Sequence, residues 1–166
     1  MIDSEGYRAN VGIIVSNAQH QVLWCRRAGQ DAWQFPQGGI EENELPEDAL
    51  YRELQEETGL SANDVMVLGQ TGDWLKYEIP EGYLRKDRDE ACLGQKQLWF
   101  LLKLREQNIE LNLARTESSE FDGYEWVDYW YPYEHVIPFK KDVYLKALRE
   151  LESFLLQDVE RSRRTG

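Results

Sequence analysis

The chain has 166 residues, 42% hydrophobic and 30% charged, which suits one globular domain with a real core. It contains no apolar run of about 18 residues, which excludes a membrane-spanning helix, and its formal net charge of −12 argues against binding along duplex DNA. The first ten residues lack a basic and apolar leader, and Cys25 and Cys92 are too few for a disulfide framework, so we expect a soluble, cytoplasmic protein.

The first third of the chain reads as strands. Residues 9–17 and 21–27 are apolar and separated by a short polar gap, which predicts a hairpin. Residues 33–40 are extended up to Pro36, and Gly38 and Gly39 then favour a tight turn.

A helix is predicted over residues 45–59, because Pro46 suits its first turn and Gly59 suits its end. Residues 64–79 indicate two strands or one bent strand, and the polar segment 80–94 indicates a loop.

The apolar segment 95–106 predicts a buried strand, and the aromatic-rich segment 121–130 predicts another. From residue 139 to about 157 the pattern becomes helical. Its apolar positions recur at three and four: Tyr144, Leu148, Leu151 and Leu155. The basic end, 161–166, is expected to fray. We therefore predict one α+β domain, a mixed β-sheet sandwiched between helices in an α/β/α arrangement.

Negative charge is concentrated in one short segment. Gly38 to Leu60 holds eight acids and one base, which accounts for more than half of the net charge. On the predicted helix, Glu53, Glu56 and Glu57 lie about 90° from the stripe of Leu50 and Leu54 that faces the core. A solvated face would lie opposite that stripe, so these carboxylates are expected at the rim of a cleft.

The spacing of this segment is specific. Gly38 is followed after five residues by Glu44, and after seven more by the run Arg-Glu-Leu-Gln-Glu-Glu-Thr-Gly-Leu, residues 52–60. The segment 38–60 resembles the Nudix box of the Nudix hydrolases at every specified position. The resemblance implies a Nudix hydrolase domain over residues 6–149, with 150–166 as the end of the last helix and a short basic tail.

The chemistry of this family explains the concentration of acidic side chains in residues 38–60. Water must attack a phosphorus surrounded by anionic oxygens, and divalent cations screen that charge and activate the water. Mg²⁺, or alternatively Mn²⁺, takes oxygen ligands, and Glu53, Glu56 and Glu57 offer three carboxylates on one patch. By resemblance, the Gly38 carbonyl and Glu120, which precedes the segment 121–130, join the metal ligands. Glu53, Glu57 and Glu120 all stay open as the base.

Other residues of the box are expected to brace it. Arg52 is four residues from Glu56 and can pair with it, and by resemblance it orients the metal-binding glutamates. Glu44 is expected to brace the loop. Asn43 stands where these loops often have glycine, and asparagine tolerates a left-handed turn. His20 and His135 are expected to be structural or exposed.

Features outside the box narrow the choice of substrate class. The segments 6–12, 33–40, 94–102, 120–132 and 139–144 are similar to the bacterial branch of RNA pyrophosphohydrolases, also known as dinucleoside polyphosphate hydrolases. The resemblance covers roughly residues 1–155.

The candidate substrate-binding residues are cations and aromatics. Arg8, Arg27 and Lys140 suit phosphate contacts, with plain surface charge as the alternative. Phe139 and Tyr77 can each stack on a base, with core packing as the alternative. Trp33 and the aromatic run 124–133 are expected to be core and sheet cover.

We therefore expect a metal-dependent enzyme that removes pyrophosphate from a 5′-triphosphorylated RNA end and leaves a monophosphate, which promotes RNA decay. The first alternative is a dinucleoside polyphosphate hydrolase that splits, for example, diadenosine tetraphosphate into ATP and AMP. A second, less favoured because the glutamates are intact, is a non-catalytic nucleotide-binding protein.

Overall fold

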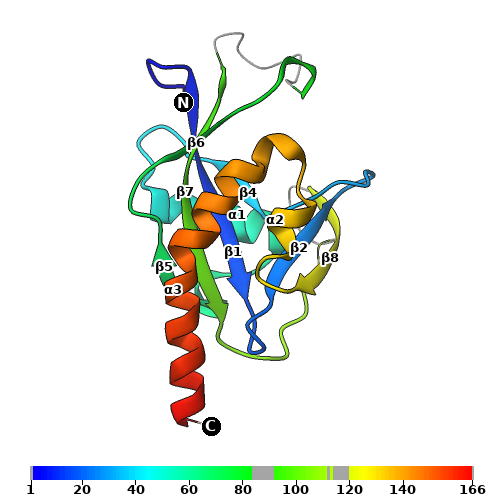
Figure 1. Cartoon of the computed structure of the whole chain (residues 1–166), viewed down its shortest axis with the longest axis vertical. Coiled ribbons are helices and arrows are strands. Elements are labelled where there is room, and N and C mark those ends of the chain that lie inside the picture. Colours follow the sequence, from blue (N-terminus) through cyan, green and yellow to red (C-terminus); the bar gives the residue numbers. More distant parts are fainter. Residues whose placement is uncertain (1, 84–91, 112, 114–119, 166) are drawn as a thin grey trace.

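The computed structural model describes residues 2–83, 92–111, 113 and 120–165 (Figure 1). In chain order the elements are β1 (Tyr7–Ser16), β2 (Val22–Arg27), β3 (Trp33–Gln34), β4 (Gln37–Gly39), α1 (Pro46–Thr58), η1 (Ala62–Asp64), β5 (Val65–Gln70), β6 (Leu75–Glu78), η2 (Glu81–Tyr83), β7 (Gly94–Leu104), β8 (Phe121–Val127), α2 (Tyr131–His135), η4 (Pro138–Lys140) and α3 (Lys141–Thr165).

The described strands form one mixed sheet. Its main path runs β3-β2-β1-β7-β5, while β4 pairs with β1, β6 with β7 and β8 with β2. β1 and β7 are parallel over ten residue pairs, from Tyr7 opposite Gly94 to Ser16 opposite Lys103, and the other pairs are antiparallel. The predicted mixed sheet is confirmed.

The hairpin of β1 and β2 is paired only at its closed end. Ser16 lies opposite Val22, and beyond this pair the two strands take different partners. β1 then pairs with β4, and β2 pairs with β3 and β8. The chain from β3 to β4 therefore crosses from one diverging strand to the other. This divergence opens the sheet at the end where β1 begins and β2 ends.

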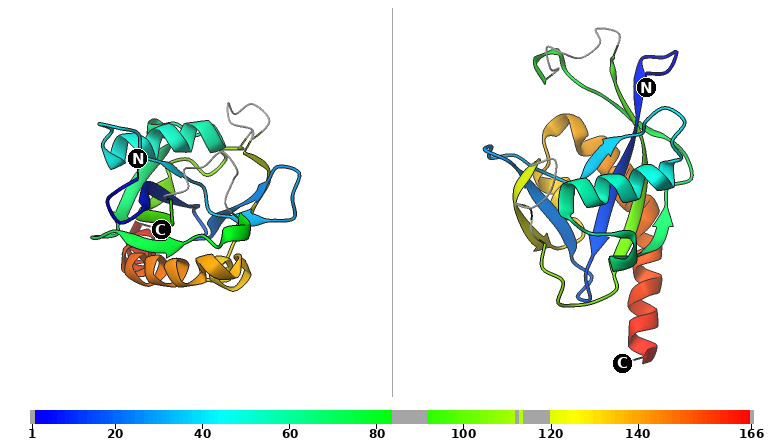
Figure 2. Two further views of the ribbon diagram at one scale, coloured as in Figure 1. Left: turned by 90° about the horizontal axis from the view of Figure 1, so that it is seen from above. Right: turned by 180° about the vertical axis from the view of Figure 1, so that it is seen from behind.

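Each face of the sheet is covered by a helix, with α1 on one side and α3 on the other (Figure 2). On the α1 side the core includes Val11, Ile13, Leu50, Leu54 and Phe100. On the α3 side it includes Ile14, Trp24, Phe35, Trp99 and the predicted helical stripe Tyr144, Leu148, Leu151 and Leu155. The predicted α/β/α layering is confirmed.

The predicted helix over 45–59 is confirmed as α1. Pro46 occupies its first turn, with Glu47 and Asp48 at the positive end of the helix. Gly59 ends it in the left-handed region, at φ +79°.

The predicted turn at Gly38 and Gly39 is wrong. Both glycines lie in β4, where Gly38 pairs with Val11 and Gly39 with Asn10. Neither has a positive φ. A glycine pair is compatible with a turn or with close packing, and here Gly38 is packed closely, as described below.

Three other segments refine the sequence reading. Residues 64–79 form two strands, β5 and β6, both paired with β7. The predicted loop 80–94 contains η2 and the start of β7, and residues 84–91 lie outside the described part. The basic end is part of α3, which continues to Thr165. Arg161 and Arg164 form ion pairs there with Asp158 and Glu160, respectively.

Among the described residues, no helix is both long and apolar enough to cross a bilayer.

The crossing segment between β3 and β4 depends on Tyr144. The Phe35 amide donates to the Tyr144 hydroxyl at 3.0 Å, and both residues are fully buried. Tyr144→Phe removes that acceptor and leaves the Phe35 N–H without it, so we predict a loss of about 1–3 kcal/mol in the free energy of unfolding, measured by urea denaturation. Tyr83→Phe, at a 58% exposed tyrosine, is the control and should change stability by less than about 0.5 kcal/mol. Equal stability of both variants would contradict this role.

Candidate active site

Arg52 donates hydrogen bonds to four residues of the acidic segment. Its Nε and Nη2 donate to the two carboxylate oxygens of Glu44, each at 2.8 Å. Nη2 also donates to the Gly39 carbonyl at 2.8 Å, and Nη1 donates to Glu53 at 2.8 Å and to Glu56 at 3.4 Å. One guanidinium therefore fixes the β4 strand, the loop before α1 and two carboxylates of α1.

The loop that carries Glu44 has the conformation expected from its sequence. Asn43 has φ +64°, so the left-handed position is filled by a residue that tolerates it. The Glu41 amide donates to Glu44 Oε1 at 2.9 Å, and the Arg52 fork binds the same carboxylate. These contacts, with the guanidinium first, lower the pKa of Glu44 to about 2.

Gly38 is required because Glu53 packs on its backbone. A Cβ atom built at Gly38 would lie 1.9 Å from the Glu53 carboxyl carbon. No side chain can occupy that space while Glu53 keeps its position. The glycine therefore brings the backbone of β4 against a carboxylate of α1.

Glu57 is the most deeply placed carboxylate of the group. It is 5% exposed, and its Oε2 accepts the Gln37 amide at 3.1 Å. Burial raises its pKa well above the usual range, and the negative charges of Glu53 and Glu120 raise it further. Glu53 is 9% exposed; burial raises its pKa, while the hydrogen bond from Arg52 opposes the rise.

Glu120 approaches the same carboxylates from the position just before β8. Its carbonyl accepts the Ala28 amide at 2.8 Å, just after the irregular pairing of β2 with β8 at Arg26 and Arg27. Asp122 accepts Arg26 Nε at 2.7 Å and the Gly29 amide at 3.0 Å, which ties the start of β8 to the turn after β2. The charge of Glu120 raises the pKa of both Glu53 and Glu57.

The donor set fits a hard divalent cation. Among the described residues no three acidic, histidine or cysteine side chains are already arranged as ligands, and Arg52 holds Glu53 and Glu56. Yet Glu53 and Glu57 are buried, the charge of Glu120 raises the pKa of both, and the charge of Glu53 raises the pKa of Glu57 further. Carboxylate oxygens are the ligands that Mg²⁺ and Mn²⁺ prefer, and a cation would relieve this repulsion.

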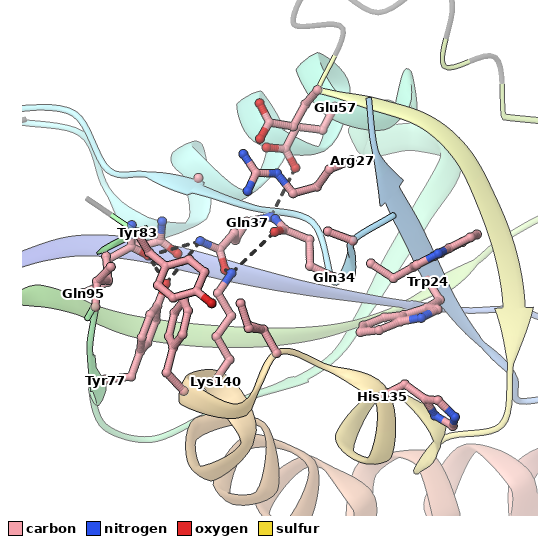
Figure 3. Close-up of a pocket in the computed structure, with 18 of the residues that line it drawn as sticks. Trp24, Arg27, Gln34, Gln37, Glu57, Tyr77, Tyr83, Gln95, His135 and Lys140 are labelled. Carbon is pink, nitrogen blue, oxygen red and sulfur yellow. Dashed lines mark hydrogen bonds between the residues drawn. The ribbon is translucent and has the colours of Figure 1, made fainter. Parts of the chain in front are cut away.

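These carboxylates line a cleft of about 820 Å³ (Figure 3). Most of the residues predicted from the sequence as catalytic, metal-binding or substrate-binding line it: Arg8, Arg27, Gly38, Glu53, Glu57, Tyr77, Glu120, Phe139 and Lys140. Arg52 and Glu56 do not line it, and Arg52 is hydrogen-bonded to Glu53, which does, and to Glu56. The cleft lies where β1 and β2 diverge.

The three predicted cations reach the cleft from different elements: Arg8 from β1, Arg27 from the end of β2 and Lys140 from η4. Arg8 Nε is buried and has no hydrogen-bond partner among the residues that the structure describes. Lys140 is 8% exposed, so it is not plain surface charge, and its Nζ lies 3.4 Å from side-chain oxygens of Gln34 and Gln37.

The two predicted aromatic residues differ in exposure. Tyr77 is 7% exposed, and its hydroxyl donates to Gln95 at 2.8 Å. Its ring stacks on the half-buried Phe139, with centroids 6.2 Å apart and planes at 28°. Tyr83 contacts the Phe139 ring at 5.1 Å. Tyr77 thus packs against one face of the Phe139 ring, and the Phe139 ring is more accessible to a ligand than the Tyr77 ring.

The sequence reading missed a network of amides on the cleft floor. Gln37 Nε2 donates to Gln95 at 3.2 Å and to the Tyr77 hydroxyl at 3.4 Å. Gln97 donates to Asn10 at 2.7 Å and is fully buried. The signal was present in β7, where glutamines occupy positions 95 and 97 and therefore lie on the same face of the strand.

One expectation about aromatic residues is wrong. Tyr131, expected as core or sheet cover, lines the cleft and is 36% exposed. Trp33 is partly buried and packs against the core on the α3 side, as expected, and it also lines the cleft. His135, expected to be structural or exposed, is exposed and also lines it. The sequence does not distinguish these two places, because aromatic residues of a core and aromatic residues of a cleft are of the same types and have the same spacing.

The sequence of this chain is similar to a known domain family and to known enzymes over most of its length. Residues 6–151 match the model of the NUDIX domain family. An RNA pyrophosphohydrolase of Halorhodospira halophila is 56% identical over 158 residues, covering 95% of this chain and 87% of that protein. An RNA pyrophosphohydrolase of Histophilus somni is 52% identical, covering 98% of this chain and 85% of that protein.

Solved structures share the fold at low identity. The E. coli dihydroneopterin triphosphate pyrophosphohydrolase aligns with a TM-score of 0.69 at 19% identity, covering 87% of this chain and 98% of that one. A C. elegans Ap4A hydrolase in a binary complex aligns with a TM-score of 0.64 at 17% identity, covering 89% and 98%.

The bond between Arg52 and Glu44 gives a stability prediction. Glu44 lies 2.8 Å from Arg52 with a side chain 14% exposed, whereas Glu41 lies 3.9 Å away and is 70% exposed. Glu44→Gln should lower the free energy of unfolding by about 1–3 kcal/mol at neutral pH, and Glu41→Gln by less than about 0.5 kcal/mol.

The pH dependence follows from the lowered pKa of Glu44. A carboxylate with a depressed folded-state pKa stabilises the fold above its unfolded pKa, and that stability is lost as pH falls toward about 2. Urea denaturation from pH 7 downward should therefore show wild type and Glu44→Gln converging. A constant difference down to the acid limit would contradict the assignment.

Proposed function

The chain belongs to the NUDIX family, and from this premise we propose that it hydrolyses the 5′-triphosphate end of RNA, releasing pyrophosphate and leaving a 5′-monophosphate. Relatives at 50–56% identity over nearly the whole chain are RNA pyrophosphohydrolases. The observation that carries the proposal is that buried carboxylates and three cations line a single cleft. The monophosphorylated product is the end that promotes RNA decay.

The proposed ligands of Mg²⁺, or of Mn²⁺, are the Gly38 carbonyl, Glu53, Glu56, Glu57 and Glu120. When bound, a divalent cation supplies charge neutralisation at the phosphates and a more acidic water. The support is the buried, mutually repelling carboxylates and the close approach of Gly38 to Glu53.

Arg52 has a positioning role in this proposal. Its bonds to Glu44 and the Gly39 carbonyl anchor the guanidinium, which then orients Glu53 and Glu56. The Gln37 amide orients Glu57 in the same way. The base that accepts the proton of the attacking water is Glu53, Glu57 or Glu120, each of which lines the cleft.

The proposed substrate contacts follow from charge and shape. Arg8, Arg27 and Lys140 bind the phosphate oxygens, since guanidinium and ammonium groups suit them. Phe139, supported by Tyr77, stacks on a base next to the charged centre. Water attacks a phosphorus of the triphosphate and breaks the anhydride bond between the α and β phosphates, and the pyrophosphate leaves.

A dinucleoside polyphosphate hydrolase is the second candidate. It would use the same carboxylates and cations, and aromatic side chains line the cleft on more than one side, as a substrate with two bases requires. A non-catalytic nucleotide-binding protein is the third, and it predicts no turnover at all.

The substrate test compares kcat/KM for 5′-triphosphorylated RNA and for diadenosine tetraphosphate, each with Mg²⁺. The proposal predicts efficient release of pyrophosphate from the RNA and loss of activity with a chelator. A preference for the dinucleotide by orders of magnitude would replace it with the second candidate, and turnover of neither would favour the third.

A matched pair on α1 tests the carboxylates. Glu57→Gln keeps the size and the hydrogen bond from Gln37 but removes charge in the cleft, so we predict a drop in kcat of about 10²–10⁴-fold. Glu47→Gln, an exposed residue of the same helix, should retain wild-type kcat. Thermal denaturation of both variants checks the fold. A near-normal kcat for Glu57→Gln would exclude Glu57 from the site.

A further inference from the structure

A buried glutamine next to the cleft has no role in the proposed chemistry. Gln97 lies near the middle of β7 and is fully buried, as is the side chain of Trp99 two residues later on the same face of the strand. In the parallel pairing, Gln97 lies opposite Asn10 of β1. Burying an amide costs free energy unless its polar atoms are hydrogen-bonded. The hydrogen bonds of Gln97 therefore show what its amide is for.

The indole of Trp99 fixes the direction in which the Gln97 amide points. Trp99 Nε1 lies 3.1 Å from Gln97 Oε1, and an indole N–H can only donate. The oxygen of Gln97 must therefore face Trp99, which turns its NH₂ group away from the indole. That group donates to Asn10 Oδ1 at 2.7 Å and to Gln37 Oε1 at 3.4 Å.

The same reasoning fixes the side chain of Gln37. Its Oε1 accepts from Gln97 and also from Lys140 Nζ, each at 3.4 Å. An ammonium group, like an indole, can only donate, so both neighbours require an oxygen at this point. The NH₂ group of Gln37 then points toward Gln95, whose Oε1 accepts it at 3.2 Å. Two hydrogen bonds in the same direction, from Trp99 to Gln97 and from Gln97 to Gln37, thus place an oxygen beside the Lys140 ammonium.

Gln37 lies between a carboxylate and a cation of the cleft. In Figure 3 it lies between Glu57 and Lys140. Its backbone amide donates to Glu57 at 3.1 Å, and its side-chain oxygen faces Lys140, which is 8% exposed and also faces Gln34 Oε1 at 3.4 Å. A buried ammonium is stabilised by carbonyl oxygens and would be repelled by the NH₂ group of a reversed amide. The orientation of the Gln37 amide therefore affects where Lys140 rests in the cleft.

We propose that Gln97 is a positioning residue for substrate binding. Oriented by the Trp99 indole, it fixes the Gln37 oxygen toward Lys140 and so holds the ammonium where it binds the phosphates. The inference rests on the proposed function, which gives Lys140 its role. Because Gln97 is fully buried, it acts through Gln37 and not on the substrate itself. Because Lys140 binds phosphates and moves no proton in the proposed reaction, the effect falls on KM and not on kcat.

The experiment is a double-mutant cycle. Wild type, Gln97→Met, Lys140→Met and the double variant are assayed with Mg²⁺ on 5′-triphosphorylated RNA, since methionine keeps the length of the side chain and removes the amide or the charge. Gln97→Met should raise KM about three- to tenfold and keep kcat within about twofold of wild type. In the Lys140→Met background the same change should leave KM unchanged, because the ammonium through which Gln97 acts is gone.

A control variant separates positioning from general destabilisation. Thr71 is fully buried, and its Oγ1 accepts the Trp99 backbone N–H at 3.0 Å. Thr71→Val removes a buried hydrogen bond from the same part of β7 but leaves the amides of the cleft floor in place. Both Thr71→Val and Gln97→Met should lower the melting temperature, but only Gln97→Met should raise KM. An equal rise of KM in both variants would overturn the positioning role.

A failure of the proposed function gives a different result. If wild type does not hydrolyse triphosphorylated RNA, that function fails, and calorimetric titration of the same four proteins with pyrophosphate and Mg²⁺ tests the positioning role without turnover. Gln97→Met should then weaken pyrophosphate binding only where Lys140 is present. Additive effects of the two substitutions, in KM or in pyrophosphate affinity, would overturn the proposal. A fall in kcat with unchanged KM would also overturn it, because the effect would then act through Glu57. Wild type that neither hydrolyses the RNA nor binds pyrophosphate would overturn both proposals.

Discussion

The carboxylates of Glu53 and Glu57 are both buried on α1, and the charge of Glu120 raises the pKa of each. The guanidinium of Arg52 is hydrogen-bonded to Glu53. Buried like charges are costly, and an opposing charge must be held rigidly to offset them. The loop before α1 supplies that rigidity, because its left-handed Asn43 leads into Glu44, which grips Arg52 with two bonds. Gly38 then allows β4 to pack against the Glu53 carboxyl.

The splayed sheet explains why this group faces a substrate. β1 and β2 are joined at Ser16 and Val22 and diverge toward Arg8 and Arg27, so the two arginines reach the cleft from separate strands. The segment between β3 and β4 crosses the divergence and carries Gln37, whose backbone orients Glu57 and whose side chain approaches Lys140. A protein with net charge −12 thereby places Arg8, Arg27 and Lys140 in one cleft, where we propose that they bind phosphates.

The sequence predicts the layers, and most of the site residues that it predicts line the cleft. Its failures have physical causes. A contact between Arg52 and Glu56 follows from helical spacing and is present at 3.4 Å, but the shorter bonds to Glu44 and Glu53 depend on tertiary structure. Gly38 is needed for close packing rather than for a turn, a distinction that local composition does not carry. Tyr131 lines the cleft although its segment predicts core or sheet cover, because an aromatic residue has the same sequence signature in a core and in a cleft.

If the buried carboxylates are the site of a divalent cation, binding of that cation must stabilise the fold. The most direct measurement is the melting temperature of chelator-treated protein as Mg²⁺ is added back, for wild type and for Glu57→Gln. A ligand at 100 times its dissociation constant adds about 2.7 kcal/mol of stability, so the melting temperature of wild type should rise with Mg²⁺, and that of Glu57→Gln should rise far less. Equal responses in the two proteins, or no response in wild type, would contradict a metal site built on these carboxylates.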